Sequence, residues 1–342
     1  MPRLTILALN FAAHDAAFDR IRALEMGNIE VVHAEYRSSW EEVSARRTGA
    51  VLDTLEVIAD ELRAALARAD VIFAFMVPRS VLTLAPRLRW VETPATGIDH
   101  MRGTGVLDAD VIVTTIGGHF APVIAEHVFA GILHFAKRLA LFDQQRRERI
   151  WQMGRVQSLA GRTLGVVGVG SIGTAVAALG KAFAMRTVGL GRGDSAGRRI
   201  AHIDRLMPRT ALPELLSAAD YAVIAVADTP ETQQMIGTAE LAAMKPDAVL
   251  VNVARGTVIN ETALVEALQH QRIAGAALDV FAREPLPQDS PLWALPNVLI
   301  TPHIATSIVE YLPQAITLFA DNVHRFLAGA PLLRQFDRHR GY

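Results

Sequence analysis

The chain contains no cysteine among its 342 residues and has no excess of charge of either sign. Without cysteine it can form no disulfide and has no thiolate nucleophile, and a metal could be held only by histidines and carboxylates. Its histidines are scattered without ligand spacing, so no metal site is predicted. The net charge of -1 provides no broad attraction to nucleic acid or to anionic lipid. We therefore expect neither nucleic acid nor a membrane as a partner.

Long apolar runs and targeting signals are also missing from the pattern. The stretch from Val123 to Ala136 is interrupted by Glu126, His127 and His134, so it falls short of the roughly 18 apolar residues that span a bilayer. The apolar run from Leu4 to Leu9 is too short for a signal peptide, and no small-residue cleavage site follows it. These features predict a cytoplasmic protein.

The length and the hydrophobic fraction of 51% predict two domains with a ligand-binding cleft between them. Short apolar strands alternate with helical stretches, which is typical of parallel sheets covered by helices. In the first third we expect a helix over Asp53 to Arg68, and a connecting helix follows over Pro122 to Leu141. The strands predicted there are Leu4 to Leu9, Ile29 to His33, Val71 to Met76, Trp90 to Thr93 and Val111 to Thr115.

A second α/β series follows, with six predicted strands, the number in a full dinucleotide-binding sheet. A last helix over Tyr311 to Leu327 has no strand after it, and we expect it to pack on the first domain. The predicted domains are residues 1–117 plus 306–342, and residues 118–305. The six strands are Thr163 to Val167, Arg186 to Leu190, Tyr221 to Val226, Ala248 to Val253, Ala274 to Val280 and Val298 to Thr301.

The glycines Gly168, Gly170 and Gly173 form a GxGxxG pattern between a buried strand and the predicted helix Thr174 to Ala184. In a dinucleotide site the three glycines allow a tight turn, close approach of the backbone to the pyrophosphate, and close packing of helix on strand. The pattern alone is weak evidence, but this strand and helix context indicates a nicotinamide dinucleotide site.

The residues after the second strand bear on the choice of cofactor. An acid about 20 positions beyond the glycines usually binds the ribose of NAD. Here Gly191 leaves room for a 2′-phosphate, and Arg192 could pair with it. Alternatively, Arg192 is solvated and Asp194 supplies the ribose contact. The pattern favours NADP over NAD.

Three polar residues follow consecutive strands: Arg255, Glu284 and His303. Hydride transfer to a 2-oxo acid needs a proton donor such as His, a carboxylate to orient it, and a guanidinium to hold the substrate carboxylate. Each also has a structural alternative: Arg255 as a helix-end ion-pair partner, Glu284 as an exposed loop acid, and His303 as a core histidine. Their shared position at the carboxyl ends of strands favours a catalytic set.

Together these segments resemble the D-isomer-specific 2-hydroxyacid dehydrogenase family, which includes phosphoglycerate dehydrogenases and glyoxylate/hydroxypyruvate reductases. The resemblance spans nearly the whole chain. It implies that His303 is the acid/base, Glu284 its carboxylate partner and Arg255 the substrate clamp. It also implies a Rossmann NAD(P)-binding domain and a flavodoxin-like substrate domain, both doubly wound α/β sheets. The matching stretches are Gly165 to Gly173, Asp228 to Thr232, Val251 to Gly256, Ala277 to Pro287 and Asn297 to His303.

The family likeness implies further site residues and a partner. Thr96 and Gly97 would bind the substrate carboxylate, and the connecting helix would serve a homodimer. Two departures are Ala95, where glycine is common, and Ala227, where proline is usual. The Arg192 loop resembles those of NADPH-using glyoxylate/hydroxypyruvate reductases, which suggests the same substrates. The implied cofactor-binding residues are Gly168, Gly170, Ser171, Ile172, Gly173, Arg192, Val226, Ala227, Thr232, Val253, Ala254 and Asp279.

Other functions remain open at this stage. The chain could act on a phosphoglycerate-like substrate, or it could be a cofactor-sensing binding protein on the same fold, which turnover would decide. Formate dehydrogenase is disfavoured because that branch uses Gln where this chain has Glu284. Trp293 is expected to pack in the core, with a place in the substrate pocket as the alternative.

Overall fold

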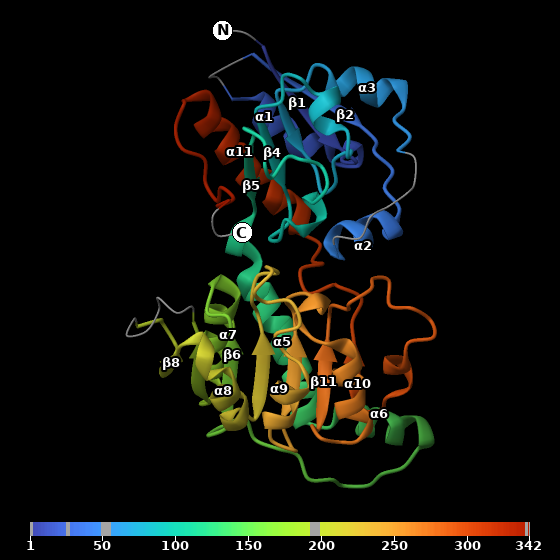
Figure 1. The fold of residues 1–342 in the computed structure, drawn as a ribbon, viewed down its shortest axis with the longest axis vertical. Coiled ribbons are helices and arrows are strands. Elements are labelled where there is room, and N and C mark those ends of the chain that lie inside the picture. Colours follow the sequence, from blue (N-terminus) through green and yellow to red (C-terminus); the bar gives the residue numbers. More distant parts are fainter. Residues whose placement is uncertain (1–2, 25–27, 49–55, 192–198, 339–340, 342) are drawn as a thin grey trace. The chain divides into compact units, whose positions relative to one another are not determined.

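Two units make up the fold of the computed structural model, which describes residues 3–24, 28–48, 56–191, 199–338 and 341 (Figure 1). Unit 1 comprises Met1–Gly117 and Ser307–Tyr342, and unit 2 comprises Gly118–Thr306. Each unit is built around its own parallel sheet. The α/β architecture predicted from the alternation of strands and helices is confirmed.

The sheet of unit 1 has five parallel strands in the order β2-β1-β3-β4-β5. This is the flavodoxin-like, doubly wound order. Strand β1 lies inside the sheet, and all six of its residues are buried, as expected of a strand covered on both faces. The strands are β1 (Leu4–Leu9), β2 (Ile29–Ala34), β3 (Val71–Phe73), β4 (Trp90–Thr93) and β5 (Ile112–Thr115).

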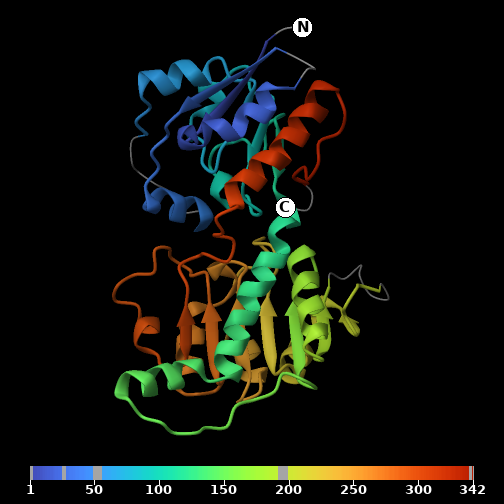
Figure 2. The ribbon, with the colours of Figure 1, turned by 180° about the vertical axis from the view of Figure 1, so that it is seen from behind.

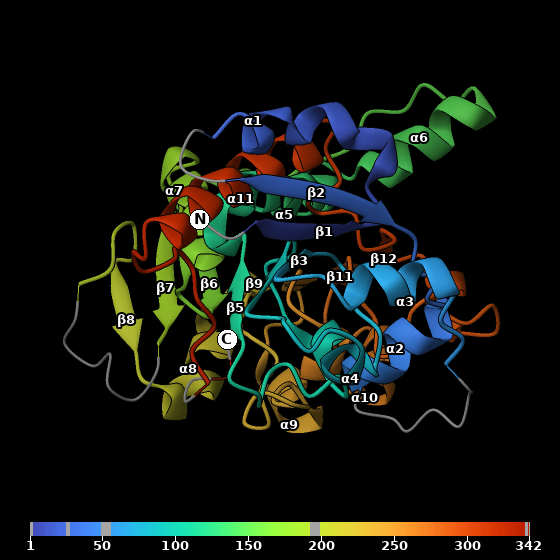
Figure 3. The same ribbon diagram turned by 90° about the horizontal axis from the view of Figure 1, so that it is seen from above.

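Helices cover both faces of this sheet, with α1 and α11 on one side and α3 and α4 on the other (Figure 3). Phe319 of α11 stacks on Phe73 of β3, with ring centroids 4.6 Å apart, so the last helix packs on the first domain as predicted. Helix α3 is shorter than the predicted Asp53 to Arg68, of which residues 53–55 lie outside the described part. The helices are η1 (Ala12–Phe18), α1 (Asp19–Arg22), α2 (Trp40–Thr48), α3 (Asp60–Leu66), α4 (Val81–Leu84), η2 (Asp99–Met101) and α11 (Tyr311–Leu327).

The sheet of unit 2 has seven parallel strands in the order β12-β11-β10-β9-β6-β7-β8. The prediction of six strands is therefore wrong, because β8 was not foreseen. The order reverses between β6 and β9, which is the switch point of a Rossmann sheet. The strands are β6 (Thr163–Val167), β7 (Arg186–Leu190), β8 (Arg205–Met207), β9 (Tyr221–Ile224), β10 (Val249–Asn252), β11 (Gly275–Leu278) and β12 (Val298–Ile300).

Two hydrophobic cores sandwich this second sheet. Helices α8, α9 and α10 cover one face (Figure 1), and α5 and α7 cover the other, as the view from behind shows (Figure 2). Because both faces are covered, every residue of the central strands β6, β9, β10 and β11 is buried. The helices are η3 (Gly117–Phe120), α5 (Ala121–Ala136), α6 (Leu139–Glu148), α7 (Ser171–Ala182), η5 (Arg209–Ala211), α8 (Leu212–Ala218), α9 (Thr238–Ala243), η6 (Gly256–Val258), α10 (Glu261–Gln269) and η7 (Pro291–Ala294).

The connecting helix differs from its prediction, because it does not run unbroken to Leu141. Arg138 takes a left-handed conformation with φ 53°, which ends α5 and separates it from α6. The stretch Gly117–Ala136 is long and apolar enough to span a membrane by length and composition. Half of it is buried, however, and α5 packs on β10 and β11 within the core of unit 2.

Candidate active site

The glycine loop after β6 has the shape that a dinucleotide phosphate site requires. Gly168 has φ 101°, a conformation that favours glycine. A Cβ on Gly173 would lie 2.0 Å from the Gly168 carbonyl oxygen, so α7 packs against the turn as closely as a glycine allows. A Cβ on Gly170 would meet no atom within 4 Å, so space is open beside the first turn of α7. The N–H groups of that turn can therefore donate hydrogen bonds to pyrophosphate oxygens.

The predicted 2′-phosphate site is only partly described. Gly191 directly follows β7, is partly buried, and donates its N–H to the Met207 carbonyl oxygen on β8. The position where an NAD-type acid is expected thus carries no side chain. Arg192 and Asp194 lie outside the described residues.

Parallel pairing brings the three proposed catalytic residues to one edge of the unit 2 sheet. Asn252 of β10 is in register with Leu278 of β11, which is in register with Ile300 of β12. Arg255, Glu284 and His303 follow these three strand ends. The loops also touch, since a Cβ on Gly256 would lie 1.8 Å from the Phe281 carbonyl carbon.

His303 and Glu284 form a direct pair. Nδ1 of His303 lies 2.8 Å from Oε2 of Glu284, and the side chains are 32% and 12% exposed. The other carboxylate oxygen of Glu284 accepts the N–H of Phe281 at 3.1 Å. Glu284 is thus not an exposed loop acid, and His303 is a partly exposed histidine bonded to a carboxylate rather than a core histidine. This arrangement fixes the orientation of the imidazole ring.

The backbone of His303 is held in an uncommon conformation, with φ 57°. Its N–H donates to the carbonyl oxygen of Asp279 at 2.9 Å. The Asp279 carboxylate accepts the N–H groups of Ile304 at 2.9 Å and Ala305 at 3.0 Å. Asp279 is only 2% exposed, so these bonds form away from water and hold the loop firmly.

Arg255 lies in an extended conformation immediately before η6, and its Nη1 donates to the Ala254 carbonyl oxygen at 2.7 Å. Asn252, which is 1% exposed, makes two hydrogen bonds to the backbone that follows β10. Its amide nitrogen donates to the Arg255 carbonyl oxygen, and its amide oxygen accepts the Ala254 N–H. The buried Asn252 therefore sets the direction in which the Arg255 backbone leaves β10.

The remaining predicted cofactor residues lie around the same sheet edge. Ser171 and Ile172 form the first turn of α7, and Val253 and Ala254 are buried after β10. In the loop after β9, the Thr232 hydroxyl donates to the Ala227 carbonyl oxygen at 2.7 Å and so holds the backbone that follows Val226. Their contacts with a cofactor, like that of Asp279, stay predictions.

The predicted substrate loop of unit 1 follows β4. Thr96 is exposed and Gly97 is partly buried. The Thr96 hydroxyl donates to the Gly117 carbonyl oxygen at 3.1 Å, and the Tyr311 hydroxyl of α11 donates to the Pro94 carbonyl oxygen. The first part of this loop is thereby bonded to two other parts of unit 1.

Sequence reasoning missed the contacts that surround Asp279. His127 of α5 and Thr301 after β12 approach its carboxylate, although 174 positions separate these two residues in the chain. The only signal in the sequence was the spacing of His127 and His134, which lie about two turns apart on one face of an apolar helix. The expectation that Trp293 packs in the core is wrong, since it is 55% exposed and its indole N–H donates to the Pro287 carbonyl oxygen.

Within the described parts of the chain, no group of three or more histidines or carboxylates could hold a metal ion.

The NAD binding domain model of the D-isomer specific 2-hydroxyacid dehydrogenases matches residues 129–305. A glyoxylate reductase from Korarchaeum cryptofilum is 36% identical over 259 residues, which are 74% of this chain and 77% of that protein. The chain belongs to this family. It is therefore an NAD(P)-dependent oxidoreductase that interconverts 2-oxo acids and D-2-hydroxy acids.

Solved structures agree with this assignment over almost the full length. A D-isomer specific 2-hydroxyacid dehydrogenase family protein from Aeromonas salmonicida has a TM-score of 0.80 and 30% identity, covering 99% of this chain and 100% of that one. A family member from Xanthobacter autotrophicus, solved with NADPH and MES, has a TM-score of 0.78 and 27% identity, covering 98% and 99%. The fold of both units is thus that of the family.

Proposed function

We propose that this dehydrogenase is an NADPH-dependent reductase of a small 2-oxo acid, of the glyoxylate or hydroxypyruvate type. Unit 2 is the cofactor domain and unit 1 the substrate domain. The observation that carries the proposal is the pairing of His303 Nδ1 with Glu284 at 2.8 Å, at the edge of the sheet where the glycine loop also begins. The name and 36% identity of the Korarchaeum relative support the choice of substrate.

In this account His303 is the proton donor. When bound, the reduced nicotinamide supplies the hydride that the substrate C2 receives. Glu284 holds Nδ1, so the other ring nitrogen, Nε2, delivers the proton to the carbonyl oxygen as negative charge develops there. The carboxylate of Glu284 also stabilises the positive charge of the imidazolium before transfer. In the oxidative direction the same nitrogen accepts the proton from the 2-hydroxyl group.

Arg255 binds the substrate. Its guanidinium presents parallel N–H donors that match a carboxylate, and its charge polarises the neighbouring carbonyl. We also propose that the backbone N–H groups of Thr96 and Gly97 in unit 1 bind the substrate carboxylate. Backbone donors of this kind recognise any 2-oxo acid, so they select for the carboxylate rather than for the substituent.

The preference for NADPH rests on the glycine that directly follows β7. Because Gly191 presents no carboxylate, nothing at that position repels a 2′-phosphate, and Arg192 is proposed to pair with it. Arg192→Ala should weaken NADPH binding by about 10-fold or more and leave NADH binding within about 2-fold. Arg186→Ala, at the opposite end of β7, is the control for loss of one positive charge. Equal losses for both cofactors would remove the 2′-phosphate argument.

We further propose a cytoplasmic homodimer. Large apolar side chains are exposed along α6 and the segment after it: Leu139 at 50%, Ile150 at 47%, Trp151 at 98% and Met153 at 91%. Exposed apolar residues gathered in one segment are typical of an interaction surface. A second copy of the chain is the proposed partner.

Steady-state rates test the function directly. NADPH and NADH oxidation should be measured with glyoxylate, hydroxypyruvate, 3-phosphohydroxypyruvate, pyruvate, and branched or phenyl 2-oxo acids. The proposal predicts the highest kcat/KM for glyoxylate or hydroxypyruvate with NADPH. A preference for the phosphorylated substrate would replace it with a phosphoglycerate dehydrogenase-like activity. Tight cofactor binding without turnover of any of these acids would instead indicate a cofactor-sensing protein.

A further inference from the structure

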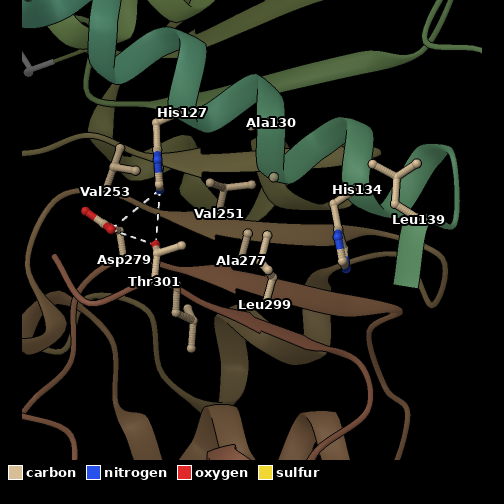
Figure 4. Close-up of a pocket in the computed structure, with 12 residues that line it drawn as sticks. His127, Ala130, His134, Leu139, Val251, Val253, Ala277, Asp279, Leu299 and Thr301 are labelled. Atoms are coloured by element: carbon tan, nitrogen blue, oxygen red, sulfur yellow. Dashed lines mark hydrogen bonds and ion pairs between the residues drawn. The ribbon is translucent and has the colours of Figure 1, made fainter. Parts of the chain in front are cut away.

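His127 lies outside the proposed catalytic set but contacts the residue that anchors it. It projects from α5 toward the sheet, and its ring points at Asp279 and Thr301 (Figure 4). Its Nε2 lies 3.1 Å from the Thr301 hydroxyl oxygen and 3.5 Å from Asp279 Oδ1. His127 also lines a cavity of about 230 Å³ between α5 and strands β10 to β12. Its side chain is 24% exposed.

The number of hydrogens that His127, Thr301 and Asp279 can donate fixes the direction of the hydrogen bonds between them. The Thr301 hydroxyl lies 2.6 Å from Asp279 Oδ1, the length of a hydrogen bond to a charged acceptor. Because threonine has only one hydroxyl hydrogen, Thr301 donates it to Asp279 and must accept from His127. His127 therefore carries its hydrogen on Nε2. The chain of donors runs from His127 to Thr301 to the Asp279 carboxylate.

Asp279 connects these hydrogen bonds to the loop that carries His303. Its carboxylate accepts the backbone N–H groups of Ile304 and Ala305, and its carbonyl oxygen accepts the N–H of His303. These bonds hold His303 in its left-handed conformation, which costs free energy and persists only because the surrounding bonds offset that cost. A change in the position of the Asp279 carboxylate would therefore move the imidazole ring of His303.

We propose that His127 is a positioning residue for His303. It acts through the Thr301 hydroxyl and the Asp279 carboxylate, and what it supplies is the Nε2 hydrogen-bond donor. The kinetic part of this inference rests on the proposed role of His303. The structural part, which is the anchoring of residues 303–305, does not.

Two amide variants test the Nε2 hydrogen-bond donor of His127 separately from the rest of its imidazole ring. The side-chain nitrogen of glutamine reaches about as far as Nε2 of histidine, whereas that of asparagine reaches only about as far as Nδ1. His127→Gln should keep kcat within about 3-fold of the parent enzyme, while His127→Asn and His127→Leu should lower kcat by about 10-fold or more. KM for the 2-oxo acid should stay within about 2-fold, since the proposed carboxylate ligands are unchanged.

His134→Leu is the matched control. His134 lines the same cavity from the same helix, and the groups described as bonded to the Asp279 carboxylate belong to residues 127, 301, 304 and 305. This variant should leave kcat unchanged. If His127→Leu fails to fold, the comparison of His127→Gln with His127→Asn still tests the proposal. Equal kcat for these two variants, whether high or low, would overturn the proposal.

Hydrogen exchange tests the anchoring without turnover. The amides of Ile304 and Ala305 should exchange about 10-fold faster in His127→Asn than in the parent protein, and at nearly the parent rate in His127→Gln. Unchanged exchange in His127→Asn would overturn the inference even if the enzyme is active. Absence of 2-oxo acid reduction by the parent would overturn the proposed function and leave the exchange result to judge the role of His127.

Discussion

At the scale of single residues, one carboxylate oxygen of Glu284 contacts Nδ1 of His303, and the other accepts the N–H of Phe281. Glu284→Gln keeps an oxygen that can accept from Nδ1 but removes the negative charge. Glu284→Ala removes both. We predict that kcat/KM falls about 10-fold in the Gln variant and about 100-fold or more in the Ala variant. The measurement is the initial rate of NADPH oxidation at saturating cofactor, and equal losses in the two variants would show that the oxygen retained by glutamine contributes nothing once the charge is lost.

Glu92 is a buried acid in unit 1 whose ionisation should affect stability. It is 1% exposed, and burial raises its pKa to about 7, although hydrogen bonds from Asn322 and Thr114 act in the opposite direction. The folded protein therefore binds a proton between pH 4.5 and about 7 that the unfolded chain has lost. Stability should thus fall as pH rises through this range, by about 3 kcal/mol, and stay level above it.

Glu92→Gln removes this titration while keeping the shape of the side chain. The variant should be more stable than the parent at pH 8 and no more stable at pH 5, as measured by urea unfolding. Glu35→Gln, at a side chain that is 69% exposed, should show no such difference. A Glu92→Gln variant destabilised equally at both pH values would contradict the assignment of a protonated Glu92.

The residues found from sequence and those missed differ in what identifies them. The placement of Arg255, Glu284 and His303 at one edge of the sheet could be predicted because each follows an apolar strand, and parallel strands bring their carboxyl ends together. The contact of His127 with Asp279 could not, since α5 meets β11 only through tertiary packing and nothing in the local pattern of either segment specifies it. Trp293 was predicted wrongly because its size suggests burial, whereas its N–H bond to Pro287 holds it at the surface.

At the scale of elements, the turn from β6 into α7 is the proposed site of the cofactor pyrophosphate. Gly173→Ala places a Cβ 2.0 Å from the Gly168 carbonyl oxygen, so helix and loop must move apart. Gly170 has φ -74° and ψ -161°, and a Cβ there meets no protein atom within 4 Å. We predict that Gly173→Ala lowers both Tm and NADPH affinity, whereas Gly170→Ala keeps Tm within about 2 °C and still lowers NADPH affinity by about 10-fold.

Calorimetry and fluorescence titration measure these two quantities. Gly170→Ala tests the site most sharply, because its Cβ can interfere only with something that is bound there. Parent-like NADPH affinity in this variant would show that the pyrophosphate lies elsewhere.

The errors in predicted elements have physical causes. Strand β8 has only three residues, one of them the exposed Arg205, which is too few to show a recognisable period. The apolar pattern of α5 continues into Leu139, Ala140 and Leu141, so periodicity alone could not locate the left-handed Arg138 that ends the helix. Element type was predictable from the alternation of short apolar strands with helical stretches, while element ends depended on single backbone conformations.

At the scale of the whole molecule, the exposed apolar segment after α6 should determine the oligomeric state. Trp151→Glu places a charge where a partner is proposed to bury an indole ring, so sedimentation equilibrium should show a shift from dimer to monomer. Val309→Glu is the control, because Val309 is 93% exposed but lies in unit 1, away from this segment in the chain. A parent protein that is monomeric at micromolar concentration, or a Trp151→Glu variant as dimeric as the parent, would contradict the proposed interface.

We propose that His303, held by Glu284, donates the proton when a 2-oxo acid is reduced. The most direct measurement is the rate of NADPH oxidation by His303→Ala with the best 2-oxo acid, alongside NADPH affinity. His270→Ala, at the end of α10, serves as the control. We predict a loss in kcat of about 100-fold or more with NADPH affinity unchanged. A His303→Ala enzyme that retains a rate near that of the parent would contradict it.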